Sequence, residues 1–349
     1  MKLNRAKCKI MVFNESETDE KIVDIEVVEN FKYLGVEIIN KRKLFKFQTK
    51  KSLDKAQKMS NLLYMTLGNS CNRLLIGKTF WKGLAIPRFM YGQDVILYTK
   101  ADIESLQRID NKAYRSILQL PIYTAVEFLR GEIGCSSVMA RELKNKLLYL
   151  KHIISGDGNK IVKKIVSEGK FKGELNWIVK VEDYMNELGI DYNYILNNKA
   201  ETIREKVNEW DTQQWIGGME GKSTLKYYRK AKQGVKEEKW IRNGVRWNVM
   251  EKARSNTLRL RWRNWALDDE KICLLCGCGV ETLEHFILDC CKLEQIRIKY
   301  VELQRPMIEQ RDEIMVSLLM FDEKDAEHHV SIVWEMWRER GRLIEMGQC

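Results

Sequence analysis

The sequence predicts a mainly α-helical protein with a small antiparallel β-sheet near its N-terminus. The 349-residue chain contains only three prolines, and 31% of its residues are charged, a composition that favours long helices with solvated faces. Apolar residues recur at intervals of three and four along much of the chain after residue 45, whereas β-branched, partly alternating runs are confined to residues 8–39. Since 44% of the residues are hydrophobic, the chain can bury a core.

Residues 1–44 are expected to form three short antiparallel strands. The strand-like runs cover residues 9–13, 22–28 and 33–39, and the polar residues 14–20 form the first connecting loop. So small a sheet is not stable alone, and its apolar face is expected to pack on the helix that follows.

Residues 45–157 are expected to form a helical bundle. Its first helix covers residues 45–67, with apolar side chains on one face. The other face is basic, because residues 41–58 include eight basic residues and one acidic residue. Lys50, Lys51 and Lys58 on that face could follow a phosphate backbone, although a merely solvated face explains them equally well. Further helices are expected over residues 72–83, 87–97, 101–118 and 138–154.

The next two segments differ in how much they reveal. Residues 158–221 form a helical connector to which the sequence assigns no role. Residues 222–270 form a basic, aromatic helical segment, with fourteen basic and three acidic residues between positions 222 and 263. Its cations could neutralise phosphates while its rings stack on unpaired bases. The alternative is that the aromatic residues anchor a core. The cations favoured for nucleic-acid binding are Arg254, Arg259, Arg261 and Arg263.

Residues 271–292 carry the densest group of metal-liganding residues in the sequence. Five of the nine cysteines and one of the four histidines lie within nineteen residues, which makes chance clustering a weak explanation. Cys273 and Cys276, followed by Gly277, resemble a zinc knuckle, and His285 and Cys290 at the start of a helix would complete a tetrahedral site. A Zn²⁺ ion held by four protein ligands would be structural, because no position remains for water.

Two alternatives remain open at this site. Cys278 could replace Cys276 as a ligand, and Cys291 could replace Cys290. The two cysteines of each pair are so close in the sequence that a small backbone shift would exchange one for the other at the metal. The cysteines could also be ordinary buried thiols in a reducing compartment.

Residues 293–349 are expected to form two helices, over 292–303 and 330–346. The formal net charge of +11 favours a polyanionic partner, RNA or DNA. No secretion signal or membrane-spanning run is evident, so an intracellular location in the cytoplasm or nucleus, no membrane partner and free thiols are expected. No small-molecule substrate is expected either.

Several motifs, in this order, resemble the region that follows the palm of LINE-type (non-LTR) retrotransposon reverse transcriptases. The resemblance covers roughly residues 7–155 and 255–292, and it implies palm-edge strands, a helical thumb and a C-terminal Cys-Cys-His-Cys zinc knuckle. It is carried by Phe31-Lys-Tyr-Leu-Gly-Val36, Lys78-Thr-Phe-Trp81, Pro87 to Gly92, Ile103 to Arg115, Phe128 to Gly134 and the knuckle itself.

The chain departs from this family at the catalytic centre. A polymerase of the family needs palm carboxylates to hold two Mg²⁺ ions, and the only Asp-Asp pair, Asp268-Asp269, lies in a polar connector. Mg²⁺ therefore belongs to the parent polymerase alone. The chain is expected to be a truncated remnant without catalytic residues that binds RNA or DNA through the thumb and knuckle. The alternative is a zinc-stabilised structural or protein-interaction protein.

Overall fold

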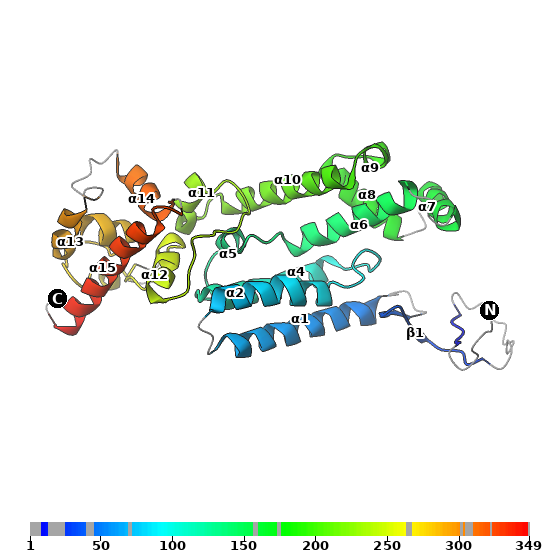
Figure 1. Ribbon diagram of the computed structural model, residues 1–349, viewed down its shortest axis with the longest axis horizontal. Coiled ribbons are helices and arrows are strands. Elements are labelled where there is room, and N and C mark those ends of the chain that lie inside the picture. The colour runs from blue at the N-terminus through cyan, green and yellow to red at the C-terminus, as the bar shows by residue number, and fades with distance from the viewer. Residues whose placement is uncertain are drawn as a thin grey trace. The chain divides into compact units, whose positions relative to one another are not determined.

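The computed structural model describes residues 8–12, 25–39, 45–68, 72–155, 160–172, 176–262, 267–300, 303, 310–321 and 323–347, with the backbone alone for 167–172 and 176. Helices make up 67% of the structure and the named strands form one two-stranded antiparallel sheet. This confirms the predicted fold class at that level (Figure 1). No helix among the described residues is long and apolar enough to span a membrane.

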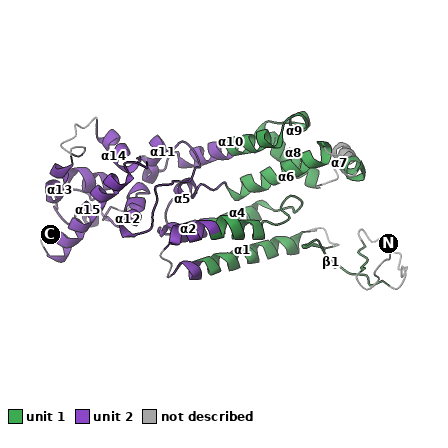
Figure 2. Cartoon of the chain, in the orientation of Figure 1, with its two compact units in different colours: residues 1–63, 80–110, 137–210 green, residues 64–79, 111–136, 211–349 purple. Residues whose placement is uncertain are grey.

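The chain divides into two compact units, each assembled from three segments (Figure 2). Unit 1 comprises residues 1–63, 80–110 and 137–210, and unit 2 comprises residues 64–79, 111–136 and 211–349. Two of the consecutive segments expected from the sequence, 45–157 and 158–221, contribute to both units, because the division falls inside three long helices. These are α1 (Lys46–Leu67), α4 (Lys100–Leu118) and α10 (Ala200–Met219).

The sheet of unit 1 is a hairpin of β1 (Asn30–Tyr33) and β2 (Val36–Ile39). Leu34 and Gly35 form the turn with φ values of 46° and 84°, the left-handed geometry that suits a two-residue hairpin. The prediction of a single strand over residues 33–39 is therefore wrong, because that run contains the turn of the hairpin. Part of the second expected strand lies outside the described residues, and its Val27 forms an isolated parallel bridge with Ile10.

Two polar contacts join the hairpin to α1. The backbone N–H of Glu37 donates to Gln48 Oε1 at 3.1 Å, and Lys51 forms an ion pair with the Glu37 carboxylate at 2.5 Å. The periodicity of residues 45–67 places Ala56, Met59 and Leu63 in the core. The sequence therefore predicts the helix correctly but its buried face only in part, because Leu62 and Met65 are exposed while the polar Gln48, Ser52 and Ser60 are buried.

The other helices of unit 1 surround a core of leucine, isoleucine and aromatic side chains. Ala140, Leu143, Leu147 and Leu150 recur at helical spacing along one side of a helix and are all buried. The helices besides α1, α4 and α10 are α3 (Ile86–Phe89), α6 (Val138–Ser155), α7 (Lys160–Lys172), α8 (Asn176–Leu188) and α9 (Tyr192–Asn197), with the π-helix η2 (Thr79–Ala85) before α3. The helix expected over residues 87–97 ends at Phe89, because a turn with Gly92 at φ 78° follows.

Unit 2 contains helices that the sequence indicates less clearly. Two of them, α5 (Val126–Ile133) and α14 (Arg311–Leu319), were not expected. Gly131 in α5 allows Tyr228 to approach, since a Cβ atom there would lie 2.2 Å from the Tyr228 hydroxyl oxygen. The remaining helices are α2 (Arg73–Lys78), α11 (Tyr228–Ala231), α12 (Val245–Arg254), α13 (Glu294–Lys299) and α15 (Ala326–Glu345), with short 3₁₀ turns at Ser223–Leu225, Asp269–Lys271 and Cys291–Leu293.

Candidate metal centre

A tight turn in unit 2 presents the first two cysteines. Ile272 and Val280 form an antiparallel bridge, and within it the Cys273 N–H donates to Gly279 O at 2.8 Å. Gly277 has φ 64°, which glycine adopts at little cost. The Cys278 N–H donates to Cys276 Sγ at 3.5 Å. The turn therefore directs a backbone N–H at a cysteine sulfur, as expected for a knuckle.

A π-helical turn presents the other two ligands. The π-turn η5 (His285–Asp289) is closed by a 2.8 Å hydrogen bond from the Cys290 N–H to His285 O. In an α-helix, residues five apart are separated by about 140° around the axis. A π-turn bonds residue i+5 to residue i, which returns Cys290 to the side of His285. The four-residue gap between these ligands thus requires a locally widened helix.

The two turns bring four ligands together. One ligand atom from each of Cys273, Cys276, His285 and Cys290 lies within 4.8 Å of the others. Cys276 Sγ is 3.3 Å from His285 Nε2, and Cys273 Sγ is 3.8 Å from Cys290 Sγ. Cys273 and Cys290 are buried, whereas Cys278 and Cys291 are exposed. The cluster is therefore the predicted set of four, and it could hold a metal ion.

The thiols of the cluster differ in acidity, since burial raises the pKa of Cys276 and the hydrogen bond with Cys273 raises the pKa of Cys290. A hydrogen bond from the Cys290 thiol lowers the pKa of Cys273 to about 3, so that Cys273 is a thiolate at neutral pH. The thiolate is the form of cysteine that binds metals. Three sulfur ligands and one imidazole are a ligand set of structural zinc sites, in which no coordination position remains for a reacting water.

Glu281 connects the cluster to the rest of unit 2. Its carboxylate is buried and accepts two hydrogen bonds from Arg340 of α15, from Nε at 2.8 Å and from Nη2 at 2.9 Å. The same carboxylate accepts the Arg261 backbone N–H at 2.8 Å and lies 3.9 Å from Cys273 Sγ. Phe286 packs edge-on against Trp337 of α15. Sequence analysis did not identify Glu281, because its partner Arg340 is 59 residues away.

We expect Glu281→Gln to weaken metal binding about 10- to 100-fold, the usual effect of removing a group that supports a ligand. The variant leaves the buried Arg340 guanidinium without a carboxylate partner. It also weakens the contacts by which Glu281 holds the Arg261 backbone and the Cys273 sulfur. Competition with a chromophoric chelator measures the affinity. Glu294→Gln, at an exposed position of α13, is the matched control. Equal affinities in the two variants would show that Glu281 does not support the site.

Arg254 does not have the role expected from the sequence. Its side chain is 1% exposed, and its Nη1 donates to Glu132 Oε2 at 2.7 Å. Glu251 lies 3.5 Å from the same nitrogen, and the Trp240 ring lies 4.5 Å from the guanidinium carbon. A phosphate has no access to a guanidinium placed in this way. The prediction of nucleic-acid binding at Arg254 is therefore wrong. Instead, this residue balances the charge of the Glu132 and Glu251 carboxylates inside unit 2.

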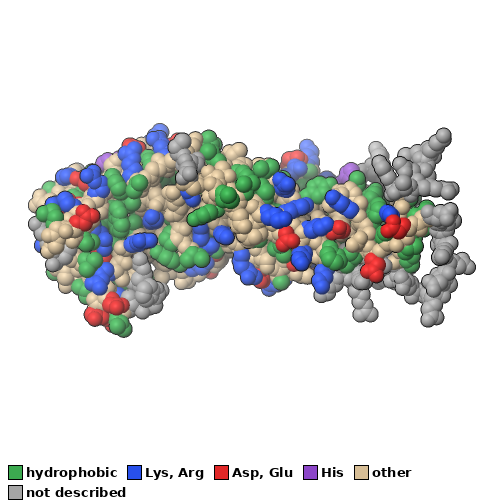
Figure 3. All heavy atoms as spheres, turned by 90° about the horizontal axis from the view of Figure 1, so that it is seen from below, with side chains coloured by type: hydrophobic (Ala, Val, Ile, Leu, Met, Phe, Trp, Pro, Cys, Tyr) green, Lys and Arg blue, Asp and Glu red, His purple; other side chains and the backbone are tan. Residues whose placement is uncertain are grey.

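The other cations selected from the sequence are placed differently. Arg259 is exposed and Arg261 is half-buried, and both precede the knuckle in unit 2. Arg263 lies outside the described residues. In unit 1, Lys50, Lys51 and Lys58 are exposed on α1, and Lys51 is the one paired with Glu37. Figure 3 shows a face of the molecule on which Lys and Arg side chains outnumber Asp and Glu side chains.

Most aromatic residues of the basic segment are in the core. Four of these side chains are at most 7% exposed, so their rings are not available for stacking on bases: Tyr227, Tyr228, Trp240 and Trp247. Trp262 is half-buried. The alternative interpretation of the aromatic pattern, that of core anchors, therefore holds for four of the five rings that the structure describes in this segment.

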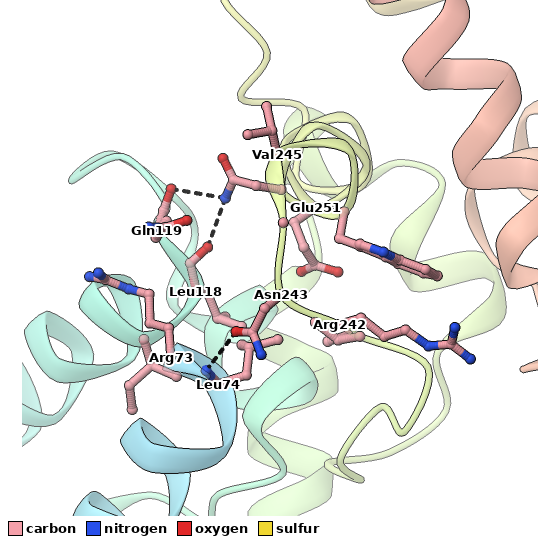
Figure 4. A pocket seen from close by; sticks show the side chains of 13 residues that line it. Arg73, Leu74, Leu118, Gln119, Arg242, Asn243, Val245 and Glu251 are labelled. Atoms are coloured by element: carbon pink, nitrogen blue, oxygen red, sulfur yellow. Dashed lines mark hydrogen bonds between the residues drawn. The ribbon is translucent and has the colours of Figure 1, made fainter. Parts of the chain in front are cut away.

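A separate pocket of about 310 Å³ lies in unit 2, beside α2 and α12 (Figure 4). Two amide side chains that line it bind backbone groups. Asn243 Oδ1 accepts the Leu74 N–H at 3.0 Å, and Asn248 Nδ2 donates to Leu118 O at 3.0 Å. The Glu251 carboxylate also lines the pocket, and its side chain is 2% exposed. Since Glu251 lies beside Arg254, the pocket wall is part of the buried charge network.

The chain matches no protein-family model, no curated protein and no solved structure. The assignment of the cluster as a metal centre therefore rests on the geometry and chemistry of its own residues.

Proposed function

We propose that residues 258–300 with α15 form a zinc-stabilised module that binds single-stranded RNA or DNA. The observation that carries the proposal is the closed cluster of three cysteines and one histidine next to exposed cations. Such a ligand set stabilises a fold rather than activating water, and zinc knuckles commonly bind unpaired nucleic acid. Glu281 connects the cluster to these cations, because its carboxylate contacts both Cys273 of the knuckle and the backbone N–H of Arg261.

The cations near the knuckle differ from Arg254 in being accessible. Arg259 is exposed two residues before Arg261, and Lys292 is exposed two residues after Cys290. Exposed cations can neutralise phosphates and release counterions. Residues on both sides of the metal centre in the sequence therefore provide charge for the same polyanion.

We further propose that the chain is part of a LINE-type reverse transcriptase, as its sequence motifs suggest. In this proposal, the helices within residues 45–157 are the thumb-like bundle, and Lys50 and Lys58 of α1 contact the nucleic-acid backbone. No polymerase activity is proposed for the chain itself, since it lacks the palm carboxylates that the reaction needs.

We expect single-stranded RNA to bind with an affinity that falls steeply between about 50 and 200 mM salt. Arg259→Ser should weaken binding several-fold and reduce the slope of log affinity against log salt by about 1. Fluorescence anisotropy with a labelled RNA, and with DNA of the same sequence, measures both quantities. The control is Arg204→Ser, because Arg204 of α10 is already paired with Glu201 at 2.9 Å.

The alternative is a zinc-stabilised module that binds another protein. It is favoured by exposed apolar side chains at the knuckle, Leu274 and Val280, which are 38% and 39% exposed. An apolar protein interface is much less sensitive to salt than phosphate contacts are. RNA binding that is undetectable, or that is equal for Arg259→Ser and Arg204→Ser, would favour this alternative.

A further inference from the structure

Two exposed thiols beside the metal centre are not among its four ligands. Cys278 and Cys291 are both free and exposed. Together with Cys276 they form a second group, in which the three Sγ atoms all lie within 4.8 Å of one another. Cys276 therefore belongs to both groups.

The backbone explains why these thiols meet. Cys278 follows the left-handed turn at Gly277, and its Sγ lies 3.0 Å from Cys276 O. Cys291 comes directly after the ligand Cys290 and begins a 3₁₀ turn. Cys278 from the first turn and Cys291 from the second turn thus converge on the side of Cys276 that faces solvent.

The chemistry of sulfur allows Cys276 to serve two ions. A thiolate has several lone pairs and can bridge two soft or borderline metal ions. A second divalent ion adds two positive charges, and the Cys278 and Cys291 thiolates add two negative charges. The net charge of the centre therefore does not change, and a second ion avoids the usual penalty for accumulating charge.

Arg297 provides an independent observation. Its side chain is 7% exposed, Nη2 donates to Cys290 O at 2.6 Å, and Nη1 is buried without a hydrogen-bond partner. The guanidinium interacts electrostatically with Cys290, with the carboxylates of Glu294 and Asp289, and with Cys291. A buried cation with an unsatisfied donor is stabilised by nearby negative charge. A thiolate-rich metal cluster supplies such charge.

We propose that Cys276, Cys278 and Cys291 bind a second thiophilic divalent metal ion, with Cys276 bridging it to the ion of the first site. The proposal rests on the proposed function, in which Cys273, Cys276, His285 and Cys290 bind the first metal ion. Three thiolates leave one coordination position of the second ion open to solvent. The second ion therefore exchanges faster than the first, which has four protein ligands.

The test is a titration of the reduced 349-residue chain with Cd²⁺, followed by thiolate-to-metal absorbance and by native mass spectrometry. We expect two Cd²⁺ per chain in the wild type and one in the Cys278→Ser/Cys291→Ser double variant. Cys8→Ser, a cysteine outside both groups, should retain two. A chelator should release one equivalent of Cd²⁺ quickly and the other slowly from the wild type, and only the slow one from the double variant.

The outcomes separate the second site from the first. One Cd²⁺ in both the wild type and the double variant would overturn the second site and leave the first intact. No Cd²⁺ in the wild type would overturn both. Two Cd²⁺ in the double variant would place the second ion elsewhere on the chain and also overturn the proposal.

Discussion

If the cluster holds zinc as proposed, chelation of the metal from the 349-residue chain is expected to unfold the knuckle and to release α15, while unit 1 stays folded. The knuckle contains two short turns and one β-bridge, which are too few backbone contacts to hold four ligands in place without a metal ion. In zinc-finger peptides the apparent binding free energy is about 10–16 kcal/mol, and it is also folding free energy. Unfolding of the knuckle should affect α15, because Arg340 and Trp337 of this helix contact Glu281 and Phe286 of the knuckle.

Hydrogen exchange measured by mass spectrometry gives the spatial test. Residues 272–290 and 326–345 should lose protection after chelation, whereas α6 and α8 of unit 1 should keep theirs. Cys273→Ser should reproduce this pattern without a chelator, and Cys8→Ser should not. Unchanged protection of residues 272–290 in metal-free protein would contradict a structural role for zinc.

Arg254→Met is expected to destabilise unit 2 by about 3–5 kcal/mol, the usual cost of removing one partner from a buried ion pair. The variant leaves the buried carboxyl groups of Glu132 and Glu251 without their common cation. Adding Glu132→Gln to this variant should restore part of the lost stability, because one of the two uncompensated charges is then removed. Chemical denaturation of the single and double variants measures this coupling.

The pH dependence of this variant provides a second check. Burial raises the pKa of Glu132 and Glu251 above their ordinary value of 4.5. A raised pKa means that the folded state binds protons more tightly, so stability is present at low pH and is lost as the pH rises through the folded-state pKa. The cost of Arg254→Met should therefore be smaller at acidic pH, where the carboxyl groups are neutral. A cost that is independent of pH would indicate that Arg254 stabilises by packing alone.

The parts of the fold that local pattern determines could be predicted from the sequence. The spacing of Ala56, Met59 and Leu63 predicts α1 and part of its buried face. The hairpin turn was missed because Leu34-Gly35 lies inside an apolar run that reads as one strand. The α5 helix was missed because it is only eight residues long.

At the metal centre, the sequence predicts the ligands better than their surroundings. The spacing of Cys273, Cys276, His285 and Cys290 identifies the cluster, since liganding residue types are rare and lie close together in the chain. Charge alone does not distinguish Arg254 from Arg259. Burial decides between these two arginines, and it depends on Glu132, which is 122 residues from Arg254. Glu281 was missed for the same reason, because its partner is distant in sequence.

The discontinuity of unit 2 has a consequence for the growing chain during synthesis. Glu132 leaves the ribosome 122 residues before Arg254. At about 5–20 residues per second, this interval lasts about 6–24 s. During this time α5 cannot bury its acidic side chain against a cation that has not yet been made. Unit 2 therefore completes this part of its core only after Arg254 has emerged, and until then water hydrates the Glu132 carboxyl group.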